Sequence, residues 1–96
     1  MDFGQFQQSL KLSSPPSAVS DHLKALWYDA KGNWDQSHNI IQDIEDADAA
    51  WIHAYLHRKE GDTGNADYWY RRAGKIRPAF SLDEEWDNIV ADLINR

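Results

Sequence analysis

Two glycine-led breaks, Gly32-Asn33 and Gly61-Asp62, divide the middle of this chain into two similar halves. Each break has an alanine seven residues before it and a small residue five residues after it. Glycine readily adopts the left-handed conformation that ends a helix, and Asn or Asp caps the start of the next one. Small residues at matching positions let paired helices approach closely. The repeated spacing therefore predicts two antiparallel helical hairpins that turn at Gly32 and Gly61.

The rest of the chain also has helical periodicity, and no alternating strand pattern is present. The predicted fold class is all-α: the two hairpins, a short N-terminal helix and a C-terminal capping helix. The string SSPPS interrupts the chain, so we expect an N-terminal segment, residues 1–17, and a single helical-hairpin domain, residues 18–96. The expected helices lie within 1–12, 18–31, 34–44, 47–60, 62–75 and 82–95.

The expected C-terminal helix is amphipathic and has a Ser-x-x-Glu capping pattern at its start, in the string SLDE. Asp46 is the expected cap of the 47–60 helix. We predict that the last helix covers the exposed apolar end of the hairpin pair. Its expected buried residues are Trp86, Ile89, Val90 and Leu93, and its expected water-facing residues are Asp83, Glu85, Asp87 and Asp92.

Composition excludes several classes of protein. The chain of 96 residues has a net charge of −6, which argues against general nucleic-acid binding because that depends on Lys and Arg. It has no cysteine, so a disulfide framework and a cysteine zinc site are excluded. No apolar run is long enough for a membrane span, and the first residues do not form a signal peptide. The sequence thus predicts a cytoplasmic protein that does not bind membranes.

The second break and its surroundings resemble the tetratricopeptide repeat, in which small residues, a large aromatic and a closing proline follow Gly-Asp at fixed intervals. The residues that match in the second copy are Ala54, Gly61, Asp62, Ala66, Tyr70, Ala73 and Pro78. The first copy matches at Ala25, Tyr28, Gly32, Trp34, Ser37 and Ile41, but it is shorter than the family's repeat and has Ile44 where Ala is usual. The resemblance covers about two repeats, roughly residues 18–78. The string WIHAYLHRKEGD and the later YWYRRAG are also similar to a small group of uncharacterised bacterial proteins.

The resemblance implies a concave groove that binds a peptide. The positions of this chain that match groove positions are Trp51, Tyr55, Arg58, Lys59, His22, Leu26 and Asp29. Trp and Tyr combine apolar area with a polar group, which suits a binding surface. We therefore expect a non-enzymatic interaction module for a protein or peptide partner, or for a second copy of the chain. No catalytic residue and no cofactor is predicted.

Two alternatives to this interpretation stay open. Trp51 and Tyr55 are equally compatible with core positions, packed against the N-terminal segment. Most of the basic residues lie within 58–77, which suits a binding protein for a small anionic metabolite.

Trp69 and Arg72 are candidate interface residues, since Tyr70 takes the packing position of the repeat and Trp69 must face elsewhere.

His53 and His57 lie one helical turn apart, the spacing of metal-binding helices. A zinc site needs a third ligand from another helix, for which His22, His38 or an aspartate are available. The zinc protease motif needs Glu after the first histidine, and Ala54 stands there. We expect that both histidines pack between helices and bind no metal, and a metal-dependent enzyme is the least favoured alternative.

Overall fold

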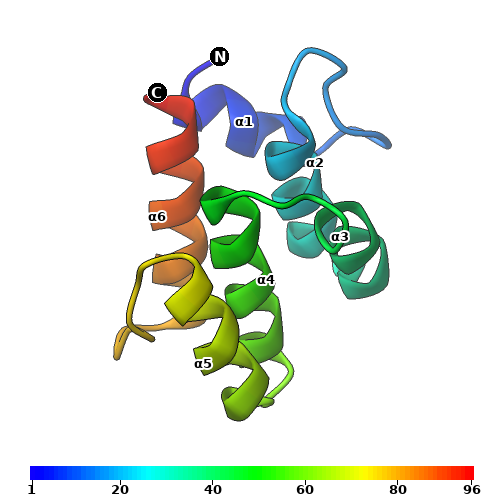
Figure 1. The fold of residues 1–96 in the computed structure, drawn as a ribbon. Coiled ribbons are helices and arrows are strands. Elements are labelled where there is room, and N and C mark those ends of the chain that lie inside the picture. The colour runs from blue at the N-terminus through cyan, green and yellow to red at the C-terminus, as the bar shows by residue number, and fades with distance from the viewer.

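A computed structural model describes all of residues 1–96 and contains six α-helices and no strand. The helices are α1 (Phe3–Ser9), α2 (Asp21–Ala30), α3 (Trp34–Ile41), α4 (Ala47–Lys59), α5 (Thr63–Arg72) and α6 (Leu82–Ile94). Figure 1 shows α4 at the centre, between α6 and the pair formed by α2 and α3. The predicted all-α fold class is confirmed. None of the helices combines the length and the apolar character that crossing a bilayer requires.

Side-chain caps determine where all six helices begin. Ser20, Asp46 and Ser81 each accept a hydrogen bond from the backbone N–H three residues further on, at 3.3, 2.7 and 3.1 Å. Each bond satisfies an N–H group that a helix start leaves unpaired, and it stabilises the helix by about 1 kcal/mol. The caps predicted at Asp46 and Ser81 are confirmed. The second helix begins later than predicted, because its cap is Ser20.

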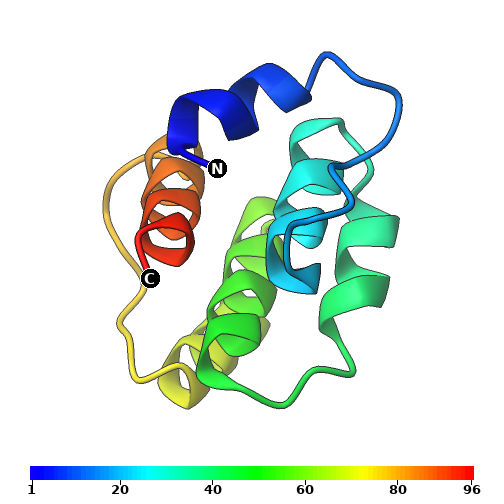
Figure 2. The same ribbon diagram turned by 90° about the horizontal axis from the view of Figure 1, so that it is seen from above.

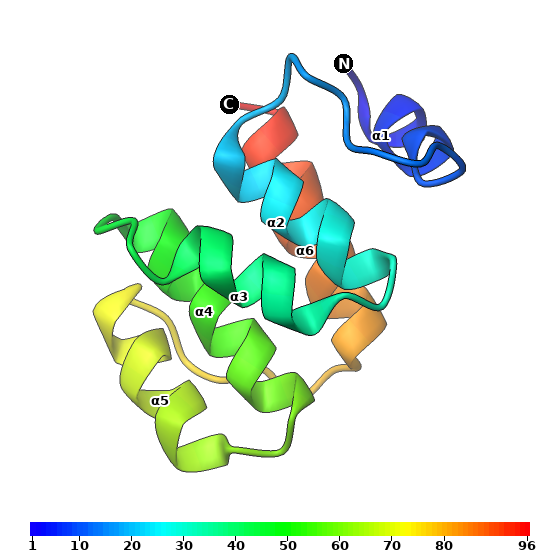
Figure 3. The ribbon, with the colours of Figure 1, turned by 90° about the vertical axis from the view of Figure 1, so that its right-hand side faces the viewer.

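The two hairpins turn at Gly32 and Gly61, as predicted. Their φ angles are +82° and +86°, in the left-handed region that strains any residue with a Cβ atom. In both turns the residue after the glycine donates its N–H to a carbonyl five residues back, at 2.9 Å. These bonds satisfy carbonyls at the helix end and reverse the chain. As a result α2 lies beside α3 and α4 lies beside α5 (Figure 3).

Two helices end earlier than the sequence predicts. The fifth helix ends at Arg72 because Gly74 has a φ of +72° and starts another left-handed turn, in which Lys75 N–H donates to the Tyr70 carbonyl at 2.8 Å. The expected end near residue 75, set by Pro78, is therefore late. The third helix ends at Ile41 and not at residue 44.

The core lies around α4, which contacts α2, α3, α5 and α6. Ala54 of α4 and Ala66 of α5 are fully buried, and their small side chains let these two helices pack closely. The larger side chains that are almost completely buried include Leu26, Trp27, Ile41, Ile52, Leu56, Ile89 and Val90. At about 25 cal/mol per Å² of buried apolar surface, each contributes roughly 1.5–3 kcal/mol.

The N-terminal and C-terminal helices complete the same core (Figure 2). On α6, Trp86 packs against Phe3 and Phe6 of α1, with ring centroids 6.4 and 6.0 Å apart. The Trp86 indole N–H donates to the Leu26 carbonyl of α2 at 3.0 Å. Phe6 is fully buried, so the predicted N-terminal segment contributes to the core of residues 18–96.

Candidate functional site

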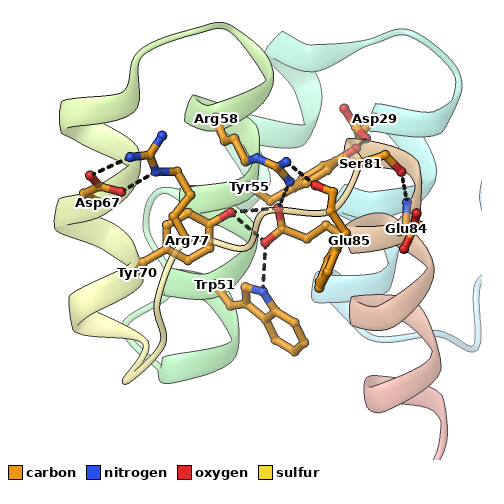
Figure 4. Close-up of polar contacts among 11 residues, drawn as sticks. Asp29, Trp51, Tyr55, Arg58, Asp67, Tyr70, Arg77, Ser81, Glu84 and Glu85 are labelled. Atoms are coloured by element: carbon orange, nitrogen blue, oxygen red, sulfur yellow. Dashed lines mark hydrogen bonds and ion pairs between the residues drawn. The ribbon is translucent and has the colours of Figure 1, made fainter.

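One face of α4 carries Trp51, Tyr55 and Arg58, the stripe that the sequence predicts to line a groove. In the structure α6 packs against this face. Figure 4 shows Trp51 and Arg58 pointing toward Glu85 of α6. The stripe is therefore covered by the chain's own C-terminal helix.

Glu85 forms the centre of a network of polar contacts, here called the Glu85 network (Figure 4). Its carboxylate accepts hydrogen bonds from Trp51 Nε1 at 3.3 Å, Arg58 Nη1 at 2.9 Å and the Tyr70 hydroxyl at 2.6 and 2.7 Å. Arg58 also donates to the Phe80 carbonyl. Glu85 is only 1% exposed, and a buried carboxylate needs such a set of donors. The prediction that Glu85 faces water is wrong for this reason.

Asp29 of α2 is the second buried acid against this face of α4. It accepts a hydrogen bond from the Tyr55 hydroxyl at 2.7 Å. It also forms an ion pair with Lys59, whose Nζ lies 2.9 Å from the carboxylate. Burial, together with the Asp29 charge, raises the pKa of the Tyr55 hydroxyl above its ordinary value. Burial and the hydrogen bond to Glu85 raise the pKa of Tyr70 in the same way. Both tyrosines therefore remain neutral hydrogen-bond donors.

The predicted groove residues thus do not share one open surface. Leu26, Asp29 and Tyr55 are buried in the core, and Trp51 and Arg58 are half-buried. His22 pairs with Asp46, and its Nε2 lies 3.0 Å from both carboxylate oxygens. Of the two alternatives that the sequence leaves open for Tyr55, the core position describes this structure. The N-terminal segment is not its cover, because α6 and Asp29 take that place.

The opposite face of α4 carries a second polar group, here called the histidine cluster: His38 of α3 with His53 and His57 of α4. One ring nitrogen from each of the three lies within 4.8 Å of the other two. The closest pair is His38 Nε2 and His53 Nε2, at 3.1 Å. The packing of α3 against α4 therefore supplies a third histidine beside the pair that the sequence singles out.

Two tryptophans hold the rings of the histidine cluster. The Trp34 ring stacks on His38 with centroids 4.9 Å apart, and the Trp69 ring stacks on His53 at 4.0 Å. Trp34 is itself fixed by a hydrogen bond from Nε1 to the Leu56 carbonyl at 2.9 Å. Planar rings stacked in this way lose little further freedom when they bind a ligand.

Burial favours the neutral form of two imidazoles of this cluster, those of His38 and His53. Desolvation, reinforced by the positive charges of His38 and His57, lowers the pKa of His53 to about 4. Desolvation also lowers the pKa of His38, and His57 acts in the same direction, while Glu60 and Asp35 partly oppose it. His57 Nδ1 lies 2.6 Å from the Glu60 carboxylate. Neutral imidazole is the form that accepts a hydrogen bond or ligates a metal.

The candidate interface residues Trp69 and Arg72 lie at the edge of the histidine cluster. Trp69 is half-buried, because one face of its ring is covered by His53. The Arg72 guanidinium lies 4.9 Å from the Trp69 ring centroid and also donates to the Tyr68 hydroxyl at 3.2 Å. Tyr68 is 45% exposed, so it is the most open aromatic on this side.

Two large apolar side chains on the segment between α5 and α6 are exposed. Ile76 is 90% exposed and Phe80 is 40% exposed. Two surface hollows flank this segment, with volumes of about 470 and 420 Å³, and both are lined by Lys75, Ile76 and Pro78. The first hollow also contains Arg71 and Arg77, and the second also contains Trp51 and Phe80.

Sequence reasoning missed Glu85 as a buried group, although one signal for it was present. Glu85 follows Leu82 by three residues and precedes Ile89 by four, so it lies on the apolar stripe of its helix. An acid on that stripe requires buried donors, and Tyr70 and Arg58 are such donors. No comparable signal links His38 to His53, because that contact depends on how α3 and α4 cross.

Comparisons of this chain with known protein families, with curated proteins and with solved structures find no match. The resemblance to the tetratricopeptide repeat therefore stays a prediction from the residues quoted above. The arrangement of helix pairs is consistent with two hairpins.

Proposed function

We propose that this chain is a non-enzymatic interaction module that binds an acidic peptide segment of a partner protein. The proposed site is the linker surface, defined here as Trp51 together with residues 71–80. The observation that carries this proposal is the exposure of Ile76 between the two hollows that flank the linker. An apolar side chain that is 90% exposed gains free energy when a partner covers it.

The charge of the linker surface favours an acidic partner. Arg71 is exposed and makes no ion pair, and the Lys75 ammonium lies 4.0 Å from the centroid of the Trp51 ring. Arg77 is partly neutralised by Asp67, at 2.9 Å. The whole chain carries a net charge of −6, so this group of cations is a local exception that would attract and orient an acidic segment.

The geometry of the linker surface suits an extended peptide with alternating side chains. The two hollows lie against the same segment and share three of its residues, so an apolar side chain can enter one while a carboxylate meets Arg71 in the other. Trp51 forms part of one hollow, which keeps one residue of the predicted groove stripe in the proposed site. Aromatic and basic residues are common anchors of protein interfaces.

The test uses a labelled synthetic peptide of alternating Glu and Leu, with a Lys and Leu peptide of equal length for comparison. We expect the acidic peptide alone to bind, and to shift the backbone amide NMR signals of residues 71–80. An Ile76→Ser variant should weaken binding about tenfold, which corresponds to the 1–2 kcal/mol of a buried aliphatic side chain.

Leu12→Ser is the matched control, because Leu12 is an exposed apolar residue far from the linker in sequence and 55% exposed. It should bind the acidic peptide as the unchanged chain does. Equal binding of both peptides, or signal changes outside the linker surface, would contradict the proposal. Concentration-dependent dimerisation that Ile76→Ser abolishes would identify a second copy as the occupant and would also contradict it.

A small anionic metabolite is the second candidate ligand, since Arg71, Lys75 and Arg77 line the same hollow. Pyrophosphate is a suitable probe. Signal changes with pyrophosphate that Arg71→Gln removes, without any effect of the acidic peptide, would favour this alternative.

A further inference from the structure

We propose that His38, His53 and His57 together bind a divalent transition-metal ion, with zinc as the first candidate. This site lies on the side of α4 away from Glu85 and is separate from the linker surface. It goes beyond the proposed interaction function and does not depend on it.

The positions of the ring nitrogens are close to what a zinc ion requires. Zinc bonds to histidine nitrogen at about 2.0–2.1 Å, which places the nitrogens of a tetrahedral site roughly 3.4 Å apart. His38 Nε2 and His53 Nε2 are 3.1 Å apart, and all three donor atoms lie within 4.8 Å of one another. A small rotation of the rings is therefore enough to surround an ion.

The backbone holds the three ligands in place. His53 and His57 project from one face of α4, one turn apart, and their rings stack with centroids 4.9 Å apart. His38 comes from α3, whose packing against α4 is part of the core. Three imidazoles leave one position of a tetrahedral ion open, and the ligand from α3, His38, is half-buried.

The groups around the three histidines match the outer shell of a metal site. Glu60 accepts from His57 Nδ1 at 2.6 Å, which fixes the tautomer and leaves Nε2 with its lone pair. Trp34 and Trp69 fix the ring planes of His38 and His53 by stacking. Arg72 is the nearby cation, and it lies over the Trp69 ring. The negative charges of the Glu60 and Asp35 carboxylates favour a positive charge at His38.

The alternative is a cluster of packed histidines without an ion. In that state one of His38 and His53 donates its Nε2–H and the other accepts. The sequence alone predicts this alternative, because helical spacing accounts for two ligands and leaves the third unassigned. The contact between α3 and α4 supplies the third ligand, which removes the main argument against a metal.

The test starts from the purified full chain after treatment with a chelator, and adds Co²⁺ and Zn²⁺. We expect one equivalent of Co²⁺ to give the visible absorption of a tetrahedral site with nitrogen ligands, and Zn²⁺ to displace it. Zinc should raise the melting temperature of the unchanged chain. In His38→Ala the zinc affinity should fall by more than about 100-fold.

His22→Ala is the matched control, because His22 is the remaining histidine and pairs with Asp46 instead. It should bind zinc like the unchanged chain. A second readout needs no variant: zinc should shift the imidazole nitrogen NMR signals of the three cluster histidines and not those of His22. Absence of tetrahedral cobalt absorption, or loss of binding in His22→Ala, would overturn the proposal. Failure of these tests leaves peptide binding at the linker surface unaffected, because none of the three histidines belongs to that surface.

Discussion

The two faces of α4 each carry a buried polar group, and the two groups differ in how their hydrogen-bonding capacity is used. In the Glu85 network, one carboxylate accepts from a tryptophan, an arginine and a tyrosine. In the histidine cluster, three basic rings face one another and only one of them has a carboxylate within hydrogen-bonding distance. The first arrangement is closed by α6 and contributes to folding. The second brings three ring nitrogens within 4.8 Å of one another, which is an arrangement suited to binding.

Deleting α6, which covers one face of α4, should have the largest effect on stability. Truncation after Phe80 deletes α6 and with it Glu85, Trp86, Ile89 and Val90, while the histidine cluster keeps all its residues. The three buried apolar side chains alone contribute about 5 kcal/mol, comparable to the whole stability of a small domain. We expect no cooperative unfolding transition in urea. An unchanged melting temperature would show that α6 is not part of the core.

A single substitution in the Glu85 network should have the next largest effect. Glu85→Ala leaves Arg58 and the Tyr70 hydroxyl without their acceptor in a buried position. Losing one partner of a buried ion pair lowers the free energy of unfolding by about 3–5 kcal/mol. Urea denaturation measures this change. The neighbouring Glu84→Ala should change stability by less than about 1 kcal/mol, since Glu84 is exposed; equal effects of the two would refute the network's role.

As the pH falls, protonation of the histidine cluster should lower the stability of the folded chain before the carboxylates are affected. The pKa of His53 is about 4 in the folded chain against an ordinary 6.5, so the unfolded chain binds the proton first as pH falls. Stability is therefore full above pH 6.5 and is lost as pH falls toward 4. In chelator-treated protein we expect a loss of about 2 kcal/mol between pH 7 and pH 5 by urea denaturation.

The control for the acid prediction is His53→Gln, which removes the titrating ring. This variant should lose less stability than the unchanged chain over the same pH interval. His38 contributes in the same direction, because its pKa is also lowered by burial. If the unchanged chain were equally stable at pH 5 and pH 7, the neutral, buried state of His53 would be refuted.

The smallest expected effect concerns the Tyr55 hydroxyl. Tyr55→Phe removes one hydrogen bond to Asp29 but leaves the ion pair with Lys59 in place. We expect a loss of about 1–2 kcal/mol in unfolding free energy. Tyr28→Phe is the matched control and should change stability by less than about 0.5 kcal/mol, because Tyr28 is half-buried and its hydroxyl makes no hydrogen bond within the protein. Similar losses in both variants would mean that the Asp29 contact contributes nothing specific.

The features predicted well from sequence are those that neighbouring residues determine. Left-handed glycines, side-chain caps and helical periodicity act over one or two turns, so the turns at Gly32 and Gly61 and the caps at Asp46 and Ser81 are found in place. Helix ends are harder to predict from sequence. Gly74 and Pro78 can each end α5, and the helix ends before the earlier of the two, Gly74.

The candidate sites depend on contacts between distant helices, which periodicity does not specify. Helical spacing predicts that Trp51, Tyr55 and Arg58 share one face of α4, but the packing of α6 determines what covers that face. The acid of α6 that meets the stripe lies 27 residues from Arg58 along the chain, and His38 lies 15 residues from His53. Amphipathic patterns indicate that a face is covered, whereas the covering partner depends on how all six helices pack together.

The contact between α1 and α6 has a consequence for the order in which the chain can assemble during synthesis. Each hairpin joins neighbouring helices, so it can close as soon as its second helix has left the ribosome. Phe3 and Phe6 are made early, yet the Trp86 ring on which they pack is made much later. Until then α1 has an apolar face without its partner and is too short to be stable alone. The nascent chain therefore lacks part of its core until α6 emerges, and docking of α6 against α1, α2 and α4 completes that core late in synthesis.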